Sequence, residues 1–417
     1  MMKRFLHGHA THPDVQMALA LAAAQIEAQR HEPGHASAPT LGWVYFTDHF
    51  APQADALLAD LQQRWPAVSW VGATGVGIAA GGTEYFDEPA LSLMLAELPR
   101  ERFRVFSGAR PLGPFASHTA NVHADPATND LGELIRDMSA RTATGYLFGG
   151  LASGRSRALH IADGVLSGGL SGVAFDAGVA LVSRVTQGCQ PVGPQRQVTE
   201  AERNVIIALD GEPALDCLLR DVGLEGVEPR AALPRLRQIL VGLGGAGSSA
   251  AEGSATRSAF DSVTHRGAFG ADTRVRHLIG LDPGRRGIAI GDVAELGSTL
   301  SFCARHVDAA RRDLTRICAE VREEVEPETL PAEAVTLARR EAPAGDTTPH
   351  ATSGIAGAIY VSCAGRGGAH FGAPSAELAL VRHALGDVPL VGFFAAGEIA
   401  RANLYGYTGV LTVFPSH

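Results

Sequence analysis

The pattern of apolar and polar positions predicts alternating helices and strands in the first third of the chain. Apolar residues recur at Ala54, Leu57 and Leu61, which is helical spacing, whereas residues 41–50 form an aromatic and β-branched run typical of a buried strand. The predicted helices cover 13–29 and 53–65, and the predicted strands cover 41–50, 68–71, 91–98 and 102–107. The glycine-rich segment GATGVG (72–77) is expected to be a loop.

Further along, residues 146–209 alternate short apolar runs with Gly, Asp and Asn turns, which predicts a meander of antiparallel hairpins. A helix over 213–220 and a boundary near 223–234 follow. The second half is predicted to contain a hairpin over 274–290, helices over 308–322 and 375–385, and strands over 298–304, 355–363, 388–395 and 409–414. Residues 323–353, rich in Glu, Pro, Ala and Thr, are expected to be a mobile loop.

One arrangement occurs in both halves of the sequence. A strand at 44–47 leads through a helix and a proline to V-x-W-V-G, which ends at Gly72. A strand at 359–362 leads through a helix and a proline to V-P-L-V-G, which ends at Gly392. A duplication and a chance match are both open from one pair of matches. The predicted fold is α+β, with two lobes of duplicated architecture, largely antiparallel or mixed sheets and outer helices.

Composition narrows the class of protein. The 417 residues are 46% hydrophobic and 19% charged, enough apolar material for a sizeable core. The net charge of −9 argues against nucleic acid as the main partner. The apolar runs are shorter than a spanning helix, and no secretory cleavage pattern follows the N-terminus, so no membrane insertion and a cytoplasmic location are expected. Five cysteines without a CxxC spacing indicate reduced thiols.

Familiar catalytic and cofactor motifs have weak support. VGLGGAGSS (241–249) matches GxGxxG, but Gly253 would break the helix that a dinucleotide needs, so a flexible loop is predicted. The sixteen histidines lack metal-ligand spacing, and no metal site is predicted. Cys363 could act as a nucleophile, with Arg366 supplying charge and His370 a base, or it could be a thiol lining a loop.

Polar chemistry is concentrated in three small-residue segments. They are GGLASG (149–154), SCAGRGG (362–368) and AAGEIARAN (395–403), and they combine glycine backbone donors with single charged groups. Arg366 suits a bidentate contact with an anion, and Glu398 suits an ammonium group, so the pair could bind an amino-acid-like ligand. An internal Arg366–Glu398 salt bridge is the alternative.

These segments resemble the FIST family, a pair of sensory domains found in bacterial signalling proteins and in an F-box protein family. The resemblance lies in WVGATGVG, GGLASG, DGVLSGGLSGVAF, QGCQPVGPQRQVT and NVIIALDGEPAL in the first part. In the second part it lies in LIGLDPGRRGIAIGD, STLSFCAR, IYVSCAGRGGAHFG, VPLVGFFAAGEIA and GYTGVLTVF. It implies an N-terminal helix and loop (1–40), a FIST N-terminal domain (41–235) and a FIST C-terminal domain (236–417).

The resemblance implies a stand-alone, non-catalytic cytoplasmic sensor that binds a small ligand such as an amino acid and signals through a separate output protein. No cofactor is expected. A haem-binding nitric-oxide sensor and a Cys363-dependent enzyme remain the alternatives. The residues expected to bind the ligand, from the motif matches and the three segments, are Gly149, Gly150, Ser153, Ser362, Cys363, Arg366, Gly367, Gly397, Glu398 and Asn403.

Overall fold

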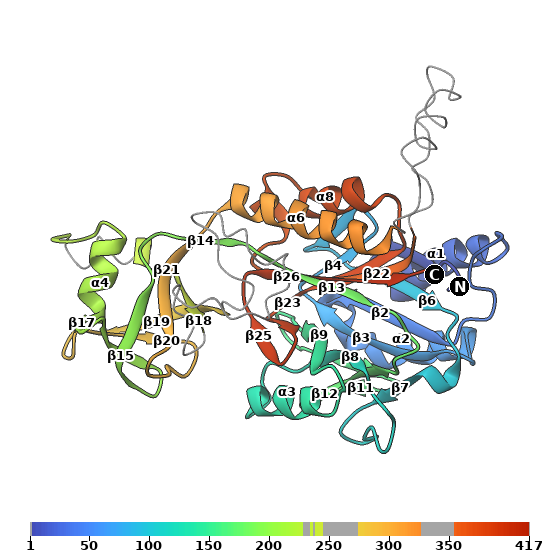
Figure 1. Cartoon of the computed structure of the whole chain (residues 1–417). Helices are drawn as coiled ribbons and strands as arrows, with labels where there is room; N and C mark the ends of the chain where they lie inside the picture. Colours follow the sequence, from blue (N-terminus) through green and yellow to red (C-terminus); the bar gives the residue numbers. More distant parts are fainter. Residues whose placement is uncertain (1, 228–233, 237, 245–273, 327–353, 417) are drawn as a thin grey trace, which may run out of the picture. The chain divides into compact units, whose positions relative to one another are not determined.

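A computed structural model describes residues 2–227, 234–236, 238–244, 274–326 and 354–416 (Figure 1). The chain forms two compact units. The first contains Met1–Thr186, Arg311–Leu404 and Thr408–His417, and the second contains Gln187–Ala310 and Tyr405–Tyr407. The fold is α+β with two lobes, as predicted, but each lobe is assembled from separate stretches of the sequence.

The first unit is built on three six-stranded sheets. In spatial order, the first contains β1 (Leu6–Thr11), β6 (Ala90–Ala96), β2 (Leu41–Thr47), β3 (Ser69–Gly75), β10 (His160–Ala162) and β11 (Val165–Leu166). The second contains β7 (Phe103–Phe106), β12 (Leu170–Phe175), β8 (Thr119–Ala124), β9 (Tyr146–Leu151), β24 (Glu398–Ala400) and β25 (Asn403–Tyr405). The third contains β13 (Val182–Gln187), β26 (Thr408–Pro415), β22 (Ile355–Cys363), β23 (Leu390–Ala395), β4 (Gly77–Ala80) and β5 (Thr83–Phe86).

Each of these sheets has a parallel strand pair joined by a helix at its centre. The pairs are β2–β3, β8–β9 and β22–β23, and the helices are α2 (Ala54–Arg64), α3 (Leu131–Ala140) and α8 (Ala376–Leu385). The β-α-β echo read from the sequence is therefore real, and a third copy, β8-α3-β9, accompanies it. All three copies lie in the first unit.

A glycine occupies the same place in every copy. Gly72, Gly149 and Gly392 lie opposite Val44, Val122 and Tyr360 in the parallel register. A Cβ on these glycines would approach the carbonyl oxygen of the opposite residue to 1.8, 1.9 and 1.7 Å, respectively. Such contacts are far inside van der Waals range, so the strand spacing requires glycine at this position.

The three sheets exchange hairpins in a closed cycle. The hairpin β4–β5 follows β3 but pairs with β23, β10–β11 follows β9 but pairs with β3, and β24–β25 follows β23 but pairs with β9. The antiparallel meander predicted over 146–209 is wrong, because β9 pairs in parallel with β8 and the next hairpin belongs to another sheet. Local alternation reveals strands but not their partners.

Side chains from α1 (Val15–Arg30) cover the edge strand β1. Asp14 caps the helix by accepting a hydrogen bond from the Met17 backbone N–H (2.9 Å). The Gln29 side chain accepts from the N–H of His7 and donates to its carbonyl oxygen, and Gln25 does the same for His9. These amides satisfy an edge that could otherwise pair with another chain.

The second unit contains a closed antiparallel barrel. The ring runs β15 (Arg196–Glu202), β16 (Val205–Leu209), β20 (Gly287–Ile290), β19 (Arg274–Asp282), β18 (Ile239–Gly244) and β21 (Thr299–Arg305), and β21 pairs again with β15. Short strands β14 (Cys189–Pro191) and β17 (Glu212–Pro213) pair with β21 and β16, and α4 (Ala214–Asp221) packs on the barrel. The predicted β19–β20 hairpin is confirmed.

Most of the remaining predicted elements are confirmed within a few residues. The helix α6 (Val307–Val325) buries Leu314 and Ile317, as its periodicity predicts. GATGVG lies almost wholly in β3 and β4 and is not the expected loop. Most of the predicted loop 323–353, and residues 245–249 of VGLGGAGSS, lie outside the described residues. Among the described residues, no helix combines the length and apolarity needed to cross a bilayer.

Candidate functional site

The carboxyl ends of the three parallel pairs converge on Ser153. Its hydroxyl group donates to the Phe394 carbonyl oxygen (2.5 Å) and accepts from the Val76 N–H (2.8 Å). Val76 and Ser153 lie just after β3 and β9, while Phe394 lies near the end of β23. Ligands of open α/β sheets commonly bind beyond the carboxyl ends of parallel strands. This junction is therefore a candidate ligand-binding region.

Glu398 lies at this end of the sheets with its carboxyl group fully buried. It pairs with Gly150 in the β24–β9 register. Oε2 accepts hydrogen bonds from the Thr408 backbone N–H (3.1 Å) and hydroxyl group (2.7 Å), whereas Oε1 is buried without a hydrogen-bond partner. Burial raises the pKa of Glu398 to about 8, although Thr408, Arg366 and Cys363 act in the opposite direction. The carboxyl group is therefore mostly protonated at neutral pH.

Cys363 ends β22 and lies beside Glu398, close enough for its thiol to lower the pKa of the carboxyl group. The residue is half-buried, as are Ala364 and Gly365 after it, and Ala396 is exposed. Solvent thus reaches the surface that borders the buried acid. The other four cysteines are buried.

Arg366 is fully buried in an ion pair. Its Nε and Nη2 donate to Oε1 of Glu377 (2.9 and 2.8 Å), and Nη1 donates to the Thr186 carbonyl oxygen (3.3 Å). Burial opposes the guanidinium charge, but Glu377 offsets this and the pKa of Arg366 lies above its ordinary value. The Arg366–Glu398 salt bridge considered from the sequence is wrong, because the carboxylate that the fork engages is that of Glu377.

Glu377 is the site residue that the sequence analysis missed. It lies in the first turn of α8, is fully buried, and also accepts hydrogen bonds from the hydroxyl groups of Tyr360 (2.7 Å) and Ser362 (3.0 Å). A usable signal was present: in the predicted helix 375–385, Glu377 occupies the same helical face as Leu378 and Val381, which are buried. A glutamate on an apolar face needs a buried cation, and Arg366 was the nearest candidate.

A second buried acid, Glu84, binds the start of the same helix. Its Oε2 accepts from the Gly368 N–H (3.0 Å) and its Oε1 from the Leu378 N–H (3.4 Å). Burial, followed by the charge on Glu377, raises the pKa of Glu84 to about 7. The region around Arg366 therefore contains two acids that titrate near neutrality, Glu84 and Glu398.

The structure brings many of the sequence-predicted residues together. Gly149 and Gly150 pair with Ile399 and Glu398, and the Gly397 carbonyl oxygen accepts from the Leu151 N–H (2.8 Å). Gly150 has no room for a side chain, since a Cβ there would lie 2.8 Å from Cγ1 of Val361. Ser362 is engaged by Glu377, Gly367 packs against Phe86, and Asn403 begins the edge strand β25.

Comparison with known proteins identifies the family. The FIST N domain matches residues 40–212 and the FIST C domain matches residues 214–401. The chain belongs to the FIST family. FIST domains are recognised as sensory, signal-transduction domains. The spatial units do not follow the two FIST domains, since strands from both share two of the three sheets of the first unit. The boundaries predicted at 40/41 and 235/236 stay a prediction.

Similar proteins span the same length. The uncharacterized protein Rv0628c of Mycobacterium tuberculosis strain H37Rv is 31% identical over 426 residues, covering 98% of both chains. The uncharacterized protein Mb0898c of Mycobacterium bovis is 31% identical over 425 residues, covering 98% of this chain and 97% of the relative.

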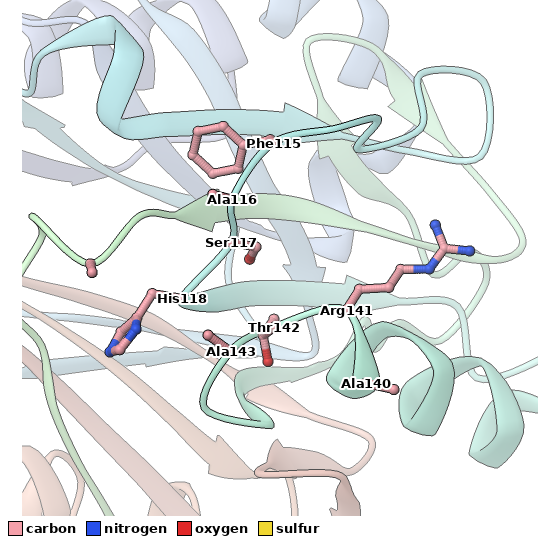
Figure 2. Close-up of a pocket in the computed structure, with 9 residues that line it drawn as sticks. Phe115, Ala116, Ser117, His118, Ala140, Arg141, Thr142 and Ala143 are labelled. Carbon is pink, nitrogen blue, oxygen red and sulfur yellow. The ribbon is translucent and has the colours of Figure 1, made fainter.

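The FIST chain also has a surface hollow of about 440 Å³ in its first unit (Figure 2). It lies beside the amino ends of β8 and β9, at the opposite end of β9 from Glu398. Its lining residues are Phe115, Ala116, Ser117, His118, Ala140, Arg141, Thr142, Ala143 and Ala177. Hydrogen bonds such as Ala143 N–H to the Ser117 carbonyl oxygen (2.9 Å) already satisfy its backbone.

These residues do not fit haem. An axial histidine must face a slot whose walls cover both faces of the porphyrin. Around the hollow the side chains are mostly small, and Figure 2 shows His118 and Arg141 at opposite sides of the view. The buried His160 already engages Ser171 and Gly168 through its two ring nitrogens. Within the described residues, no three His, Cys, Asp or Glu side chains are grouped as a metal site.

Proposed function

We propose that this FIST protein is a sensor that binds a small ligand without catalysing a reaction. The observation that carries the proposal is the buried Glu398 carboxyl group. Its Oε1 has no hydrogen-bond partner, and the neighbouring Cys363 is only half-buried, so solvent reaches the adjacent surface. An unsatisfied buried polar atom costs free energy, and a ligand group that satisfied it would regain that cost.

The chemistry of Glu398 favours a polar ligand. When protonated, the carboxyl group offers an O–H donor, and when ionised it accepts an ammonium group. The amino group of an amino acid, or of a similar metabolite, meets the second condition and displaces the proton. Arg366 supports this ligand indirectly, because Glu377 holds its fork and its positive charge favours the ionised form of Glu398.

The proposed binding surface comprises the predicted residues around Glu398. Gly149, Gly150, Gly397 and Ser153 set the backbone, Cys363 borders solvent, and Ser362, Arg366 and Gly367 hold the neighbouring segment. Asn403 lies at the next strand. We further propose a cytoplasmic location and signalling through a separate output protein, since sensory domains act by changing a partner's activity.

A thermal-shift screen of the twenty amino acids and haem tests this function. A ligand that binds the native state raises the melting temperature by mass action. The shift should be lost in Glu398→Gln and retained in Asp48→Asn, which alters another buried acid, at the end of β2. A screen without any shift, or a shift that Glu398→Gln leaves intact, contradicts the proposal.

The same screen separates the alternatives. A shift with haem and a Soret band in the loaded protein would favour the haem sensor. Turnover of a compound that is lost in Cys363→Ser would favour an enzyme. Saturable binding without turnover is the result that the non-catalytic sensor requires.

A further inference from the structure

The five thiols of the chain differ in their access to reagents. Cys189, Cys217, Cys303 and Cys318 are buried, whereas Cys363 is half-buried at the end of β22. Burial raises the pKa of the Cys318 thiol to about 12 and also raises the pKa of Cys217. Buried thiols with raised pKa values react slowly, because the thiolate is the nucleophile. Access alone therefore singles out Cys363.

A second observation marks the same place. The Glu398 carboxyl group, fully buried and lacking a partner at Oε1, lies within hydrogen-bonding reach of the Cys363 thiol. Thr408 fixes the other oxygen through two hydrogen bonds. The carboxyl group is thus held in one orientation against sulfur, and it can take the thiol proton or return it.

We propose that Cys363 is a reversible oxidation site for hydroperoxides, with Glu398 as its proton-transfer partner. Sγ attacks the outer oxygen of ROOH, an S–O bond forms, and the O–O bond breaks. Sulfur is oxidised to the sulfenic acid, the peroxide is reduced to ROH, and the thiol proton passes by way of Glu398 to the leaving alkoxide. The balance is Cys–SH plus ROOH giving Cys–SOH plus ROH.

The surroundings suit this step. Glu398 has a pKa of about 8, so near neutral pH it can exist in either protonation state, as a proton carrier must. The sulfenic hydroxyl group can then hydrogen-bond to the carboxyl group. This oxidation would regulate the proposed ligand site, because both use the same carboxyl group. The inference rests on the proposed function only in the claim that oxidation regulates ligand binding. The oxidation itself can be tested without any ligand.

The experiment treats the purified full-length protein with tert-butyl hydroperoxide and then with dimedone, which traps sulfenic acids, and maps the adduct by peptide mass spectrometry. The expected adduct lies on Cys363, and thiol reductants prevent it when added before dimedone. Cys363→Ser should abolish the adduct, whereas Cys318→Ser should leave it unchanged. An adduct spread over the buried cysteines, or its absence from Cys363, would overturn the proposal.

The role of Glu398 needs a separate readout. Glu398→Gln should slow oxidation by at least about tenfold, within the usual range for a positioned acid or base. It should also move the pH midpoint of Cys363 alkylation by iodoacetamide, which a purely structural change would not do. Thr408→Val keeps the acid and the backbone N–H donor to Oε2 but removes the hydroxyl donor, and it should slow oxidation less. An unchanged rate and midpoint in folded Glu398→Gln protein would reject Glu398 as the partner. Oxidation that proceeds while the ligand screen fails would reject the proposed function alone.

Discussion

The hydroxyl group of Tyr45 lies 3.0 Å from Nε2 of His123, and the two residues occupy equivalent positions in two of the β-α-β copies. Each follows the residue opposite the shared glycine, Val44 in β2 and Val122 in β8. Both side chains are fully buried and pack against the Phe393 ring. Burial, with a smaller contribution from His160, lowers the pKa of His123 to about 3, so the imidazole is neutral. The copies thus meet through a hydrogen bond between equivalent residues.

Replacing Tyr45 with Phe should destabilise the first unit by roughly 1–3 kcal/mol, because a buried imidazole nitrogen loses its partner. Urea denaturation of the variant measures this cost. The matched control is Tyr85→Phe, which removes a comparable hydrogen bond to His9 (2.6 Å) from a less buried place and should cost less. Equal costs for the two variants would show that burial of the Tyr45–His123 pair adds nothing.

Replacing Arg366 with Met should cost roughly 3–5 kcal/mol, since Glu377 would remain as a buried charge without its cation. Chemical denaturation of wild type and variant measures the difference. Arg382→Met removes an arginine from an exposed pair with Asp387 (3.4 Å) and should change stability by less than about 1 kcal/mol. If Arg366→Met were as harmless as Arg382→Met, the buried ion pair would not hold the 362–368 segment.

The stability contributed by Glu398 should fall as pH rises. Its pKa is about 8 in the folded protein against an ordinary 4.5, so between these values the unfolded chain binds fewer protons than the native one. Unfolding is then favoured by rising pH, by roughly 3 kcal/mol between about pH 5 and pH 8 for this group. Glu398→Gln should remove this part of the slope. Melting curves across this pH range make the comparison.

Glu84 titrates in the same direction, with a pKa of about 7, so the wild-type slope contains both groups. The difference between wild type and Glu398→Gln isolates Glu398, and Glu84→Gln isolates the other acid. A wild-type and a Glu398→Gln protein whose melting temperatures stay parallel from pH 5 to pH 8 would contradict the raised pKa of Glu398.

Gly392→Ala should destabilise the protein by at least about 3 kcal/mol, because the new Cβ would lie 1.7 Å from the Tyr360 carbonyl oxygen and the backbone would have to move. Gly164→Ala is the matched control, since a Cβ there has no neighbour within 4 Å. Thermal unfolding of both proteins tests the shared strand spacing. A small loss of stability in Gly392→Ala would mean that β22 and β23 can move apart at little cost in free energy.

Local patterns predicted most elements, and the reason for the failures is physical. The strand at 355–363 and the helix at 375–385 were predicted within a residue because buried runs and helical periodicity are local properties. The exchange of hairpins between sheets was not predicted, since pairing depends on contacts between distant segments such as Ile78 and Phe393. The third β-α-β copy was missed because no proline and no V-x-x-V-G run follow its helix at 131–140, unlike in the other two copies.

In the candidate site, too, local features were predicted from the sequence and contacts between distant segments were not. Glycine-rich segments and single charges marked Gly150, Cys363, Arg366 and Glu398 as candidates from the sequence, and their role as ligand-binding residues stays a prediction. These segments did not include the partner of Arg366, and the only sequence signal for it was the position of Glu377 on the apolar face of the predicted helix 375–385. Glu377 is eleven residues away on α8, and Glu398 lies further along the chain on β24. The packing of α8 decides between them.

The three sheets exchange hairpins in a closed cycle. We therefore expect the protein to fold even when the order of the three β-α-β copies along the chain is changed. The two ends lie together, with the Met2 N–H donating to the Ser416 carbonyl oxygen (2.8 Å; Figure 1). Joining them with a short linker and opening the chain between Gly113 and Pro114, two exposed residues between β7 and β8, breaks no strand pairing. Exposed turns between complete elements tolerate new termini. The permuted protein should therefore fold, with a melting temperature within a few degrees of wild type.

The informative control opens the chain between Ala396 and Gly397 instead. Ala396 is also exposed, but this cut separates β23 from the hairpin β24–β25 that pairs with β9, and it frees the Gly397 carbonyl oxygen that accepts from Leu151. Docking the hairpin on β9 would then require the ordering of a free chain end, which costs conformational entropy. We expect this second permutant to melt much lower and to expose Glu398. Two permutants of equal stability would show that the continuity of β23 with its exchanged hairpin does not stabilise the unit.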